Sequence, residues 1–178
     1  MRNRFARATA RTAVLGASAA LVATAAPAAF AQDAAPAAQG RTCVLKAGGG
    51  MDCGGGGRRI AAGPWAIKVH QHPNYGGESV TFYLPAGVSQ CSGPFENEYP
   101  INIAHGDFWD NRISSVQSND ATNCNIKLYD GHELTANTRG STGFADHCKR
   151  LSDPSTCVYY TAPKNKPFDN VTSSFIIS

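Results

Sequence analysis

The feature that most constrains the fold of this chain is an internal repeat with an offset of 59 residues. Residues Trp109–Val116 (WDNRISSV) and Phe168–Phe175 (FDNVTSSF) share an aromatic residue, Asp-Asn, Ser-Ser and an apolar residue in the same order. Residues Ala66–Gln71 (AIKVHQ) and Asn125–Asp130 (NIKLYD) match at the same offset. Because two separate pairs of segments share one offset, we predict two copies of one supersecondary unit that bury their apolar faces against each other.

Short runs of alternating or β-branched residues, separated by turn residues, fill the chain from Trp65 to Ser178. No stretch there keeps an apolar period of 3.6 residues over three turns, so an all-β fold is predicted. We expect each repeat to be a Greek key of about four strands, and the two keys to form a sandwich. The first key is expected at about residues 65–118 and the second at about residues 125–178. The expected strands include Ile67–Val69, Ser79–Leu84, Ile126–Leu128, Val158–Thr161 and Ser174–Ile177.

Residues 1–31 have the pattern of a secretory signal peptide. Four arginines lie in the first dozen residues, an alanine-rich apolar run follows, and Ala29-Phe30-Ala31 fits a signal-peptidase site. The apolar run is shorter than the roughly 20 residues of a membrane span. Without the four arginines, 12 basic residues face 13 acidic ones, a balance that does not favour nucleic-acid binding. We therefore expect a secreted, extracellular protein with no nucleic-acid or membrane partner.

Residues 32–64 are rich first in Ala and Pro and then in Gly, which favours a flexible arm ahead of a domain at residues 65–178. Six cysteines are an even set, and in a secreted chain they favour three disulfides among 15 pairings. Proximity favours Cys148–Cys157, and elimination then leaves Cys91–Cys124. Cys43 and Cys53 either close a small loop on themselves or tie the arm to the domain.

The repeated Asp-Asn-x-x-Ser-Ser segment offers carboxylate, amide and hydroxyl oxygens. Such side chains either cap their own backbone or gather around a hard cation, of which calcium takes six to eight oxygen ligands. Six residues are too few to surround the ion, so a second loop or water would supply the other ligands. Because the motif recurs at the same place in both repeats, we favour a calcium site.

These motifs resemble the calcium signature Asn/Asp-Asn/Asp-x-x-Ser/Thr-Ser of microbial members of the βγ-crystallin superfamily, and both copies match it in full. Residues Val69–Gly77 (VHQHPNYGG) also resemble the folded hairpin of that family, in which an aromatic residue precedes a glycine by seven positions. His70 stands where the family usually has the aromatic residue. In the second repeat Tyr129 is in place, but Ala136 occupies the glycine position, so the segment to Gly140 departs from the family pattern.

The resemblance implies two calcium sites shared crosswise, in which the motif loop of one Greek key meets the hairpin of the other. Gln71 and Asp130, next to the hairpin aromatic positions, are expected to add backbone or side-chain oxygens. With one or two carboxylates per site, we expect dissociation constants on the order of 10⁻⁵ to 10⁻³ M. The side-chain ligands are expected among Asp110, Asn111, Ser114, Asp169, Asn170 and Ser173.

We therefore expect a secreted, non-enzymatic calcium-binding protein of the βγ-crystallin type, in which Ca²⁺ stabilises the fold and the chain is a monomer. The spacings typical of a P-loop, a zinc protease or a serine nucleophile are absent from the sequence, and an enzyme is not expected. A transition-metal site at His70 and His72 lacks an evident third ligand.

The alternative is a proteinase inhibitor, because the chain also resembles small secreted bacterial inhibitors of metallopeptidases with a crystallin-like fold. A disulfide-braced loop, such as Pro85–Asp107 or Ala162–Pro167, would then occupy the cleft of a secreted protease. A third hypothesis, with less support, is a toxin or cell-surface binder that uses the arm as a tether.

Overall fold

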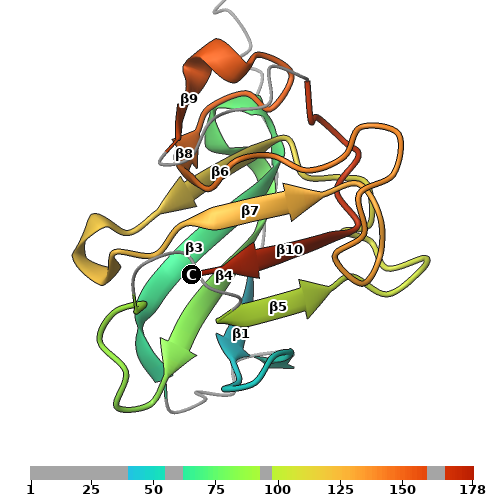
Figure 1. Cartoon of the computed structure of the whole chain (residues 1–178). Coiled ribbons are helices and arrows are strands. Elements are labelled where there is room, and N and C mark those ends of the chain that lie inside the picture. Colours follow the sequence, from blue (N-terminus) through green and yellow to red (C-terminus); the bar gives the residue numbers. More distant parts are fainter. Residues whose placement is uncertain (1–39, 55–61, 93–97, 160–166) are drawn as a thin grey trace, which may run out of the picture. The chain divides into compact units, whose positions relative to one another are not determined.

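The structure is a computed structural model that describes residues 40–54, 62–92, 98–159 and 167–178, all of which belong to one compact unit. Ten strands join in the order β2-β1-β4-β3-β6-β8-β7-β10-β5, and β9 pairs with β8 (Figure 1). The described residues contain three short 3-10 turns and no α-helix. None of their helical segments is long and apolar enough to cross a membrane. The prediction of an all-β fold is confirmed.

The strands and turns alternate along the chain. Their bounds are β1 (Arg41–Leu45), β2 (Met51–Gly54), β3 (Ala62–His72), η1 (Pro73–Tyr75), β4 (Gly76–Pro85), β5 (Tyr99–Asn102), β6 (Ser115–Ser118), η2 (Asp120–Thr122), β7 (Ile126–Tyr129), β8 (Ala145–Cys148), η3 (Pro154–Thr156), β9 (Cys157–Tyr159) and β10 (Ser174–Ile177).

The 59-residue repeat of the sequence is also a repeat of strand pairing. In the β3–β6 pair, Val69 lies opposite Val116. In the β7–β10 pair, Leu128 lies opposite Phe175, which is the same register moved by 59 residues on both strands. The two halves also exchange strands, because β5 of the first half pairs with β10, and β8 of the second half pairs with β6.

The sheet folds over on itself, so that β10 faces β4 across the core (Figure 1). The rings of Phe82 on β4 and Phe175 on β10 meet edge to face, with centroids 5.3 Å apart. Ile67, Val116 and Leu128 are also buried in this core. Each such side chain contributes about 1.5–3 kcal/mol when it leaves water, so burial in this core stabilises the packed halves.

The expectation of a flexible arm at residues 32–64 is wrong for the part of it that the structure describes. There, β1 and β2 form an antiparallel hairpin, and β1 pairs in parallel with β4. The turn of this hairpin also meets the last strand in the order, since Gly50 donates its N–H to the carbonyl of Pro100 at 3.0 Å. Long-range backbone pairing therefore orders a stretch whose composition favours flexibility. Burial of three side chains adds to this, those of Cys43, Val44 and Leu45.

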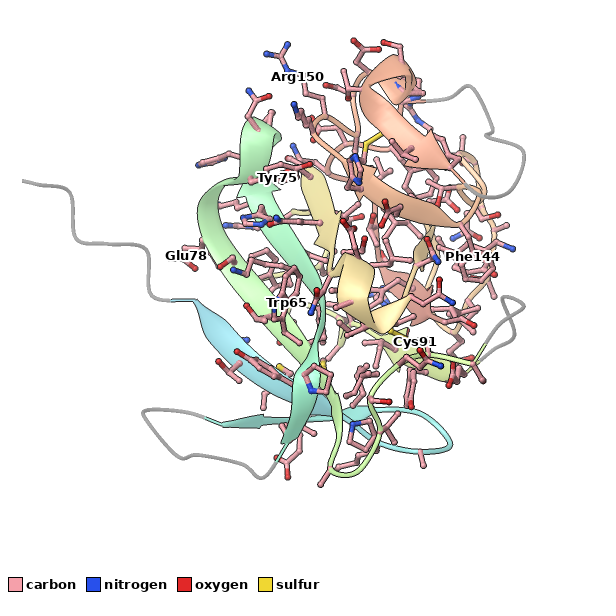
Figure 2. The ribbon with its side chains drawn as sticks, turned by 90° about the vertical axis from the view of Figure 1, so that its left-hand side faces the viewer. Trp65, Tyr75, Glu78, Cys91, Phe144 and Arg150 are labelled. Atoms are coloured by element: carbon pink, nitrogen blue, oxygen red, sulfur yellow. A yellow bond between two sulfur atoms is a disulfide. The ribbon has the colours of Figure 1, made fainter. Side chains whose placement is uncertain are left out.

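Three disulfides join all six cysteines, as the sequence predicted. Cys43–Cys53 closes the arm hairpin on itself, which resolves the alternative left open by the sequence. Cys91–Cys124 and Cys148–Cys157 are the other two, with Cys91 labelled in Figure 2. Three disulfides fit an oxidising compartment. The expected signal peptide lies outside the described residues.

The second hairpin keeps the backbone of the first although its sequence departs from the family pattern. Asn74 and Tyr75 have positive φ angles of 56° and 63°. The residues 59 positions later, Glu133 and Leu134, have φ angles of 55° and 57°. Neither Glu nor Leu favours this left-handed region, so the surrounding structure must hold the backbone there.

A buried serine holds each hairpin. The Ser115 hydroxyl donates to the carbonyl of His72 at 2.7 Å and accepts from the N–H of Tyr75 at 3.1 Å. In the second repeat the Ser174 hydroxyl accepts from the N–H of Leu134 at 3.0 Å and donates to the carbonyl of Gly131. The second Ser of each motif therefore fixes the hairpin of its own repeat, which explains why Ser-Ser recurs as a pair.

His70 is a buried imidazole in the position that Tyr129 holds in the second repeat. It is 6% exposed, and its two ring nitrogens have no hydrogen-bond partner among the described residues. Its ring centroid lies 5.5 Å from that of Tyr75, which is labelled in Figure 2. Desolvation by burial, together with the charge of Lys68, lowers the pKa of His70 from 6.5 to about 4. His70 therefore serves as a neutral aromatic ring in the core.

We expect protonation of His70 to lower the free energy of unfolding by about 3 kcal/mol as the pH falls from 7 to 4. The unfolded imidazole binds a proton near pH 6.5 and the folded one near pH 4, so acid favours the unfolded chain throughout this window. Urea unfolding at a series of pH values measures the slope. His70→Phe, which cannot bind the proton, should lose this part of the slope. Equal slopes in both proteins would contradict the assignment.

Candidate functional site

The two Asp-Asn-x-x-Ser-Ser loops lie against each other and exchange backbone hydrogen bonds. Asn111 donates its N–H to the carbonyl of Thr172 at 2.9 Å. The equivalent bond, from Asn170 to the carbonyl of Ile113, measures 3.1 Å. Each loop thus donates one equivalent backbone hydrogen bond to the other. The two loops are therefore related by an approximate twofold symmetry at this point.

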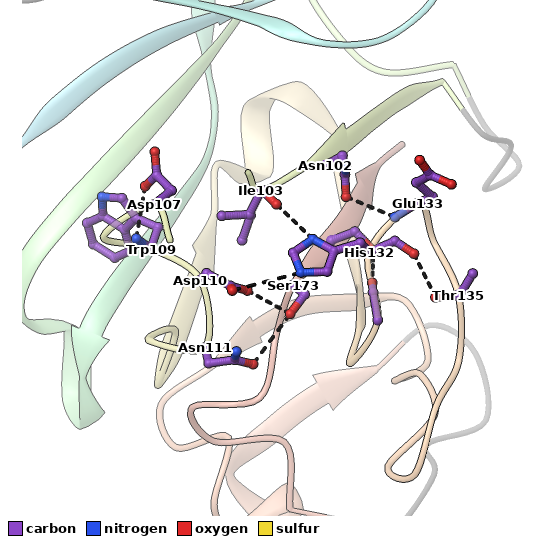
Figure 3. Close-up of polar contacts among 12 residues, drawn as sticks. Asn102, Ile103, Asp107, Trp109, Asp110, Asn111, His132, Glu133, Thr135 and Ser173 are labelled. Carbon is purple, nitrogen blue, oxygen red and sulfur yellow. Dashed lines mark hydrogen bonds and ion pairs between the residues drawn. The ribbon is translucent and has the colours of Figure 1, made fainter. Parts of the chain in front are cut away.

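The side chains of the loops cross in the same way. The Ser173 hydroxyl donates to Asp110 Oδ1 at 2.7 Å and lies 3.4 Å from Asn111 Oδ1 (Figure 3). The Ser114 hydroxyl donates to Asn170 Oδ1 at 3.2 Å. The first Ser of each motif thus reaches the Asp-Asn pair of the other. We call Asp110, Asn111 and Ser173 the first cluster, and Asp169, Asn170 and Ser114 the second cluster.

Local sequence explains how these loops hold their shape. Asn111 and Asn170 have φ angles of 57° and 52°, in the left-handed region that Asn tolerates better than most residues. The aromatic residue that opens each motif is buried, with Trp109 6% and Phe168 2% exposed. A buried ring before the turn and a strand after it therefore fix the polar side chains between them.

The second cluster contains a buried carboxylate oxygen without a partner. Asp169 Oδ1 is shielded from solvent and makes no hydrogen bond to any described residue. A buried, unpaired carboxylate oxygen is costly unless a proton, a water or a cation satisfies it. In chemical terms both clusters offer carboxylate, amide and hydroxyl oxygens, the donor set that hard divalent cations prefer.

The hairpin residues expected as further ligands have different surroundings. Asp130 accepts hydrogen bonds from the N–H groups of Asn137, at 2.6 Å, and Arg139. Burial opposes ionisation of Asp130, but these backbone hydrogen bonds outweigh it and lower its pKa below the ordinary value. The Asp130 carboxylate is thus engaged within its own loop. Gln71 lies half-buried on β3, and its role as a ligand stays a prediction.

Two histidines that the sequence did not single out lie beside the first cluster. His132 Nε2 is 3.8 Å from Asp110 Oδ2, and the ring centroids of His105 and His132 are 3.7 Å apart. His105, Asp110 and His132 form a group whose potential ligand atoms all lie within 4.8 Å of one another. The two histidines are 27 residues apart and belong to no motif, so no sequence signal indicated that they would meet.

No protein-family model, curated protein or solved structure matches this chain. The interpretation of the site therefore depends on its own geometry and donor chemistry. The loops on which the inhibitor hypothesis depends fall partly outside the described residues, at 93–97 and 160–166. That hypothesis stays a prediction.

Proposed function

We propose that this is a secreted, non-enzymatic calcium-binding protein of the βγ-crystallin type, in which Ca²⁺ stabilises the fold. The observation that carries the proposal is the reciprocal contact between the two motifs, through Ser173 with Asp110 and Ser114 with Asn170. A motif that only capped its own turn would have no need to send its hydroxyl to the loop of the other repeat.

The unpaired oxygen of Asp169 also supports a cation in the second cluster. A cation at this point would bind the unpaired Asp169 oxygen and would be coordinated by oxygen atoms from both repeats. Since the two halves of the core must be in register for the clusters to exist, an ion bound there would be bound by the folded chain only. Binding of that kind adds about 2.7 kcal/mol to stability at 100 times the dissociation constant.

The strand arrangement supports the Greek-key part of the proposal. In the first half, β3 and β4 form a hairpin, β6 returns to the free side of β3, and β5 leaves to pair with β10. In the second half, β7 pairs with β10 with the register of the first half. Two keys that exchange one strand and face each other would form the crystallin-type sandwich.

Calorimetric titration of the protein with CaCl₂ should reveal two sites, with a rise in Tm of roughly 5–10 °C at saturation. Asp169→Asn should leave one site, because it removes the charge of the second cluster while keeping the shape of the side chain. Ser114→Ala should weaken the same site, since its hydroxyl belongs to the second cluster.

Asp153→Asn is the matched control. Asp153 is an exposed carboxylate that caps η3 through the N–H of Ser155 and lies outside both motifs. Its variant should bind two calcium ions with unchanged affinity. A wild-type melting curve that does not move in millimolar calcium would overturn the proposed function, and so would full binding by Asp169→Asn.

A further inference from the structure

The first cluster differs from the second in having two imidazoles next to its carboxylate. His105 lies in the loop after β5, Asp110 in the first motif loop, and His132 in the loop after β7. Three separate loops thus bring two nitrogen donors and one carboxylate together, with all potential ligand atoms within 4.8 Å.

The hydrogen bonding of His132 prepares one ring nitrogen for a metal. Its Nδ1 lies 2.9 Å from the carbonyl oxygen of Ile103 (Figure 3). A carbonyl can only accept, so Nδ1 carries a proton, and in the neutral ring the lone pair is on Nε2, which faces Asp110 at 3.8 Å. A histidine that binds a metal almost always donates its other N–H to a carbonyl or carboxylate in this way.

The carboxylate is held in place as well. Asp110 Oδ1 accepts the 2.7 Å hydrogen bond from Ser173, so Oδ2 is the oxygen turned toward His132. His105 is exposed, whereas Asp110 and His132 are half-buried. The open side of the group thus gives a metal ion access from solvent, and the other two ligands are fixed by hydrogen bonds.

Within the described part of the chain, no comparable group of ligand atoms includes Asp169. The residue 59 positions before His132 is Pro73, and the residue 59 positions after His105 is Lys164. In the sequence, Asp169 takes the place of Asp110, and a proline and a lysine stand at the positions of the two histidines. The sequence repeat therefore does not extend to the two histidines.

We propose that the first cluster contributes to a site for a transition-metal ion of the zinc type, formed by His105, Asp110 and His132. Its metal preference would differ from that of the second cluster, which offers oxygen ligands. Imidazole suits zinc, copper and nickel, whereas calcium binds oxygen almost alone. Zinc bonds of about 2.0–2.1 Å place tetrahedral ligand atoms about 3.3 Å apart. The 3.8 Å between His132 and Asp110 is close to that value, and rotation of the exposed His105 would complete a three-ligand site with water as the fourth ligand.

The inference shares Asp110 with the proposed calcium function but does not depend on it. If the first cluster prefers zinc, the protein binds one ion of each type, and calcium titration in the presence of zinc should find one site in place of two. If calcium binding fails altogether, the nitrogen-containing site remains.

The test is titration of the full, disulfide-bonded protein with ZnCl₂, and separately with CoCl₂ to follow the ligand-field absorption of bound Co²⁺. We expect one equivalent to bind and the Co²⁺ spectrum to be that of a four-coordinate site with nitrogen ligands. His105→Ala, which removes an exposed side chain and should fold normally, is expected to lower zinc affinity at least tenfold. His132→Ala should do the same.

His147→Ala is the matched control, because His147 is also half-buried and has its Nδ1 2.9 Å from an Asp146 carboxylate oxygen. It should retain full zinc affinity. Asp169→Asn should retain zinc affinity and lose only the calcium site of the second cluster, which separates failure of this inference from failure of the calcium proposal. No zinc binding by the wild type, or equal affinity in the His105→Ala and wild-type proteins, would overturn the inference.

Discussion

Replacing Phe175 by Ala should lower the free energy of unfolding by about 3–5 kcal/mol. The side chain is 2% exposed and meets the ring of Phe82 at 5.3 Å. It lies on β10, which pairs with β7 on one side and β5 on the other. The substitution would leave a cavity where both halves of the chain pack, so the loss should exceed that of a residue buried within one half.

Two comparisons make this prediction specific. Val116→Ala, at the equivalent position of the first repeat, removes fewer carbon atoms and should cost about 2 kcal/mol. Val158→Ala is the surface control, since Val158 is 44% exposed, and it should change stability by less than about 0.5 kcal/mol. Urea denaturation measures all three. A loss below 1 kcal/mol for Phe175→Ala would mean that the core is not shared between the halves.

Removal of the Cys91–Cys124 disulfide should lower stability by about 3–4 kcal/mol. The two cysteines are 33 residues apart, and a cross-link that closes a loop of this length removes about that much free energy from the unfolded chain. Both side chains are buried, and the N–H of Cys91 also donates to the carbonyl of Thr122 at 2.8 Å. Replacing both cysteines by Ala keeps the backbone contact and removes the covalent link together with two buried sulfur atoms.

The Cys43–Cys53 pair provides the comparison. Its loop is shorter, with a separation of 10 residues, so the double Ala variant should lose about 2–3 kcal/mol. Thermal unfolding of the two double variants and of the wild type measures which disulfide contributes more to stability. A larger loss for Cys43 and Cys53 would show that the arm hairpin contributes more than loop closure alone.

The repeat was the part of the fold that the sequence predicted best. Both motif segments and both opening segments occupy equivalent places, with Val69 opposite Val116 and Leu128 opposite Phe175. Two copies of one pattern give the same strand pairing because the alternation of apolar and polar residues sets the register. The Cys148–Cys157 disulfide followed from proximity, whereas the sequence left the pairing of Cys43 and Cys53 open.

The arm and the second hairpin were less predictable, because long-range contacts decide their structure. Residues 41–45 become a strand by pairing with β4, which composition does not reveal. Glu133 and Leu134 take left-handed backbone angles that their types disfavour, held in part by Ser174, which is 40 residues from Leu134. In each case tertiary contacts override local propensity.

The site was predicted in part. The motif residues come together as pairs across the two repeats, with Ser173 on Asp110 and Ser114 on Asn170. The sequence did not predict the imidazoles of His105 and His132 as ligands, because ligands that come from separate loops have no fixed spacing. A search for histidines in loops that the repeat places near the motifs would have been the only sequence-based approach to them.

The arm hairpin covers an edge of the sheet that another chain could otherwise pair with. Without β1, the ten-residue strand β4 would present an open edge, and long open edges promote edge-to-edge aggregation. The hairpin replaces that edge with the four-residue strand β2, which carries Asp52. At the other end of the strand order, the edge strand β5 contains Pro100, and its carbonyl already accepts the N–H of Gly50. By covering the edge of β4, the arm hairpin should reduce edge-to-edge self-association at high protein concentration.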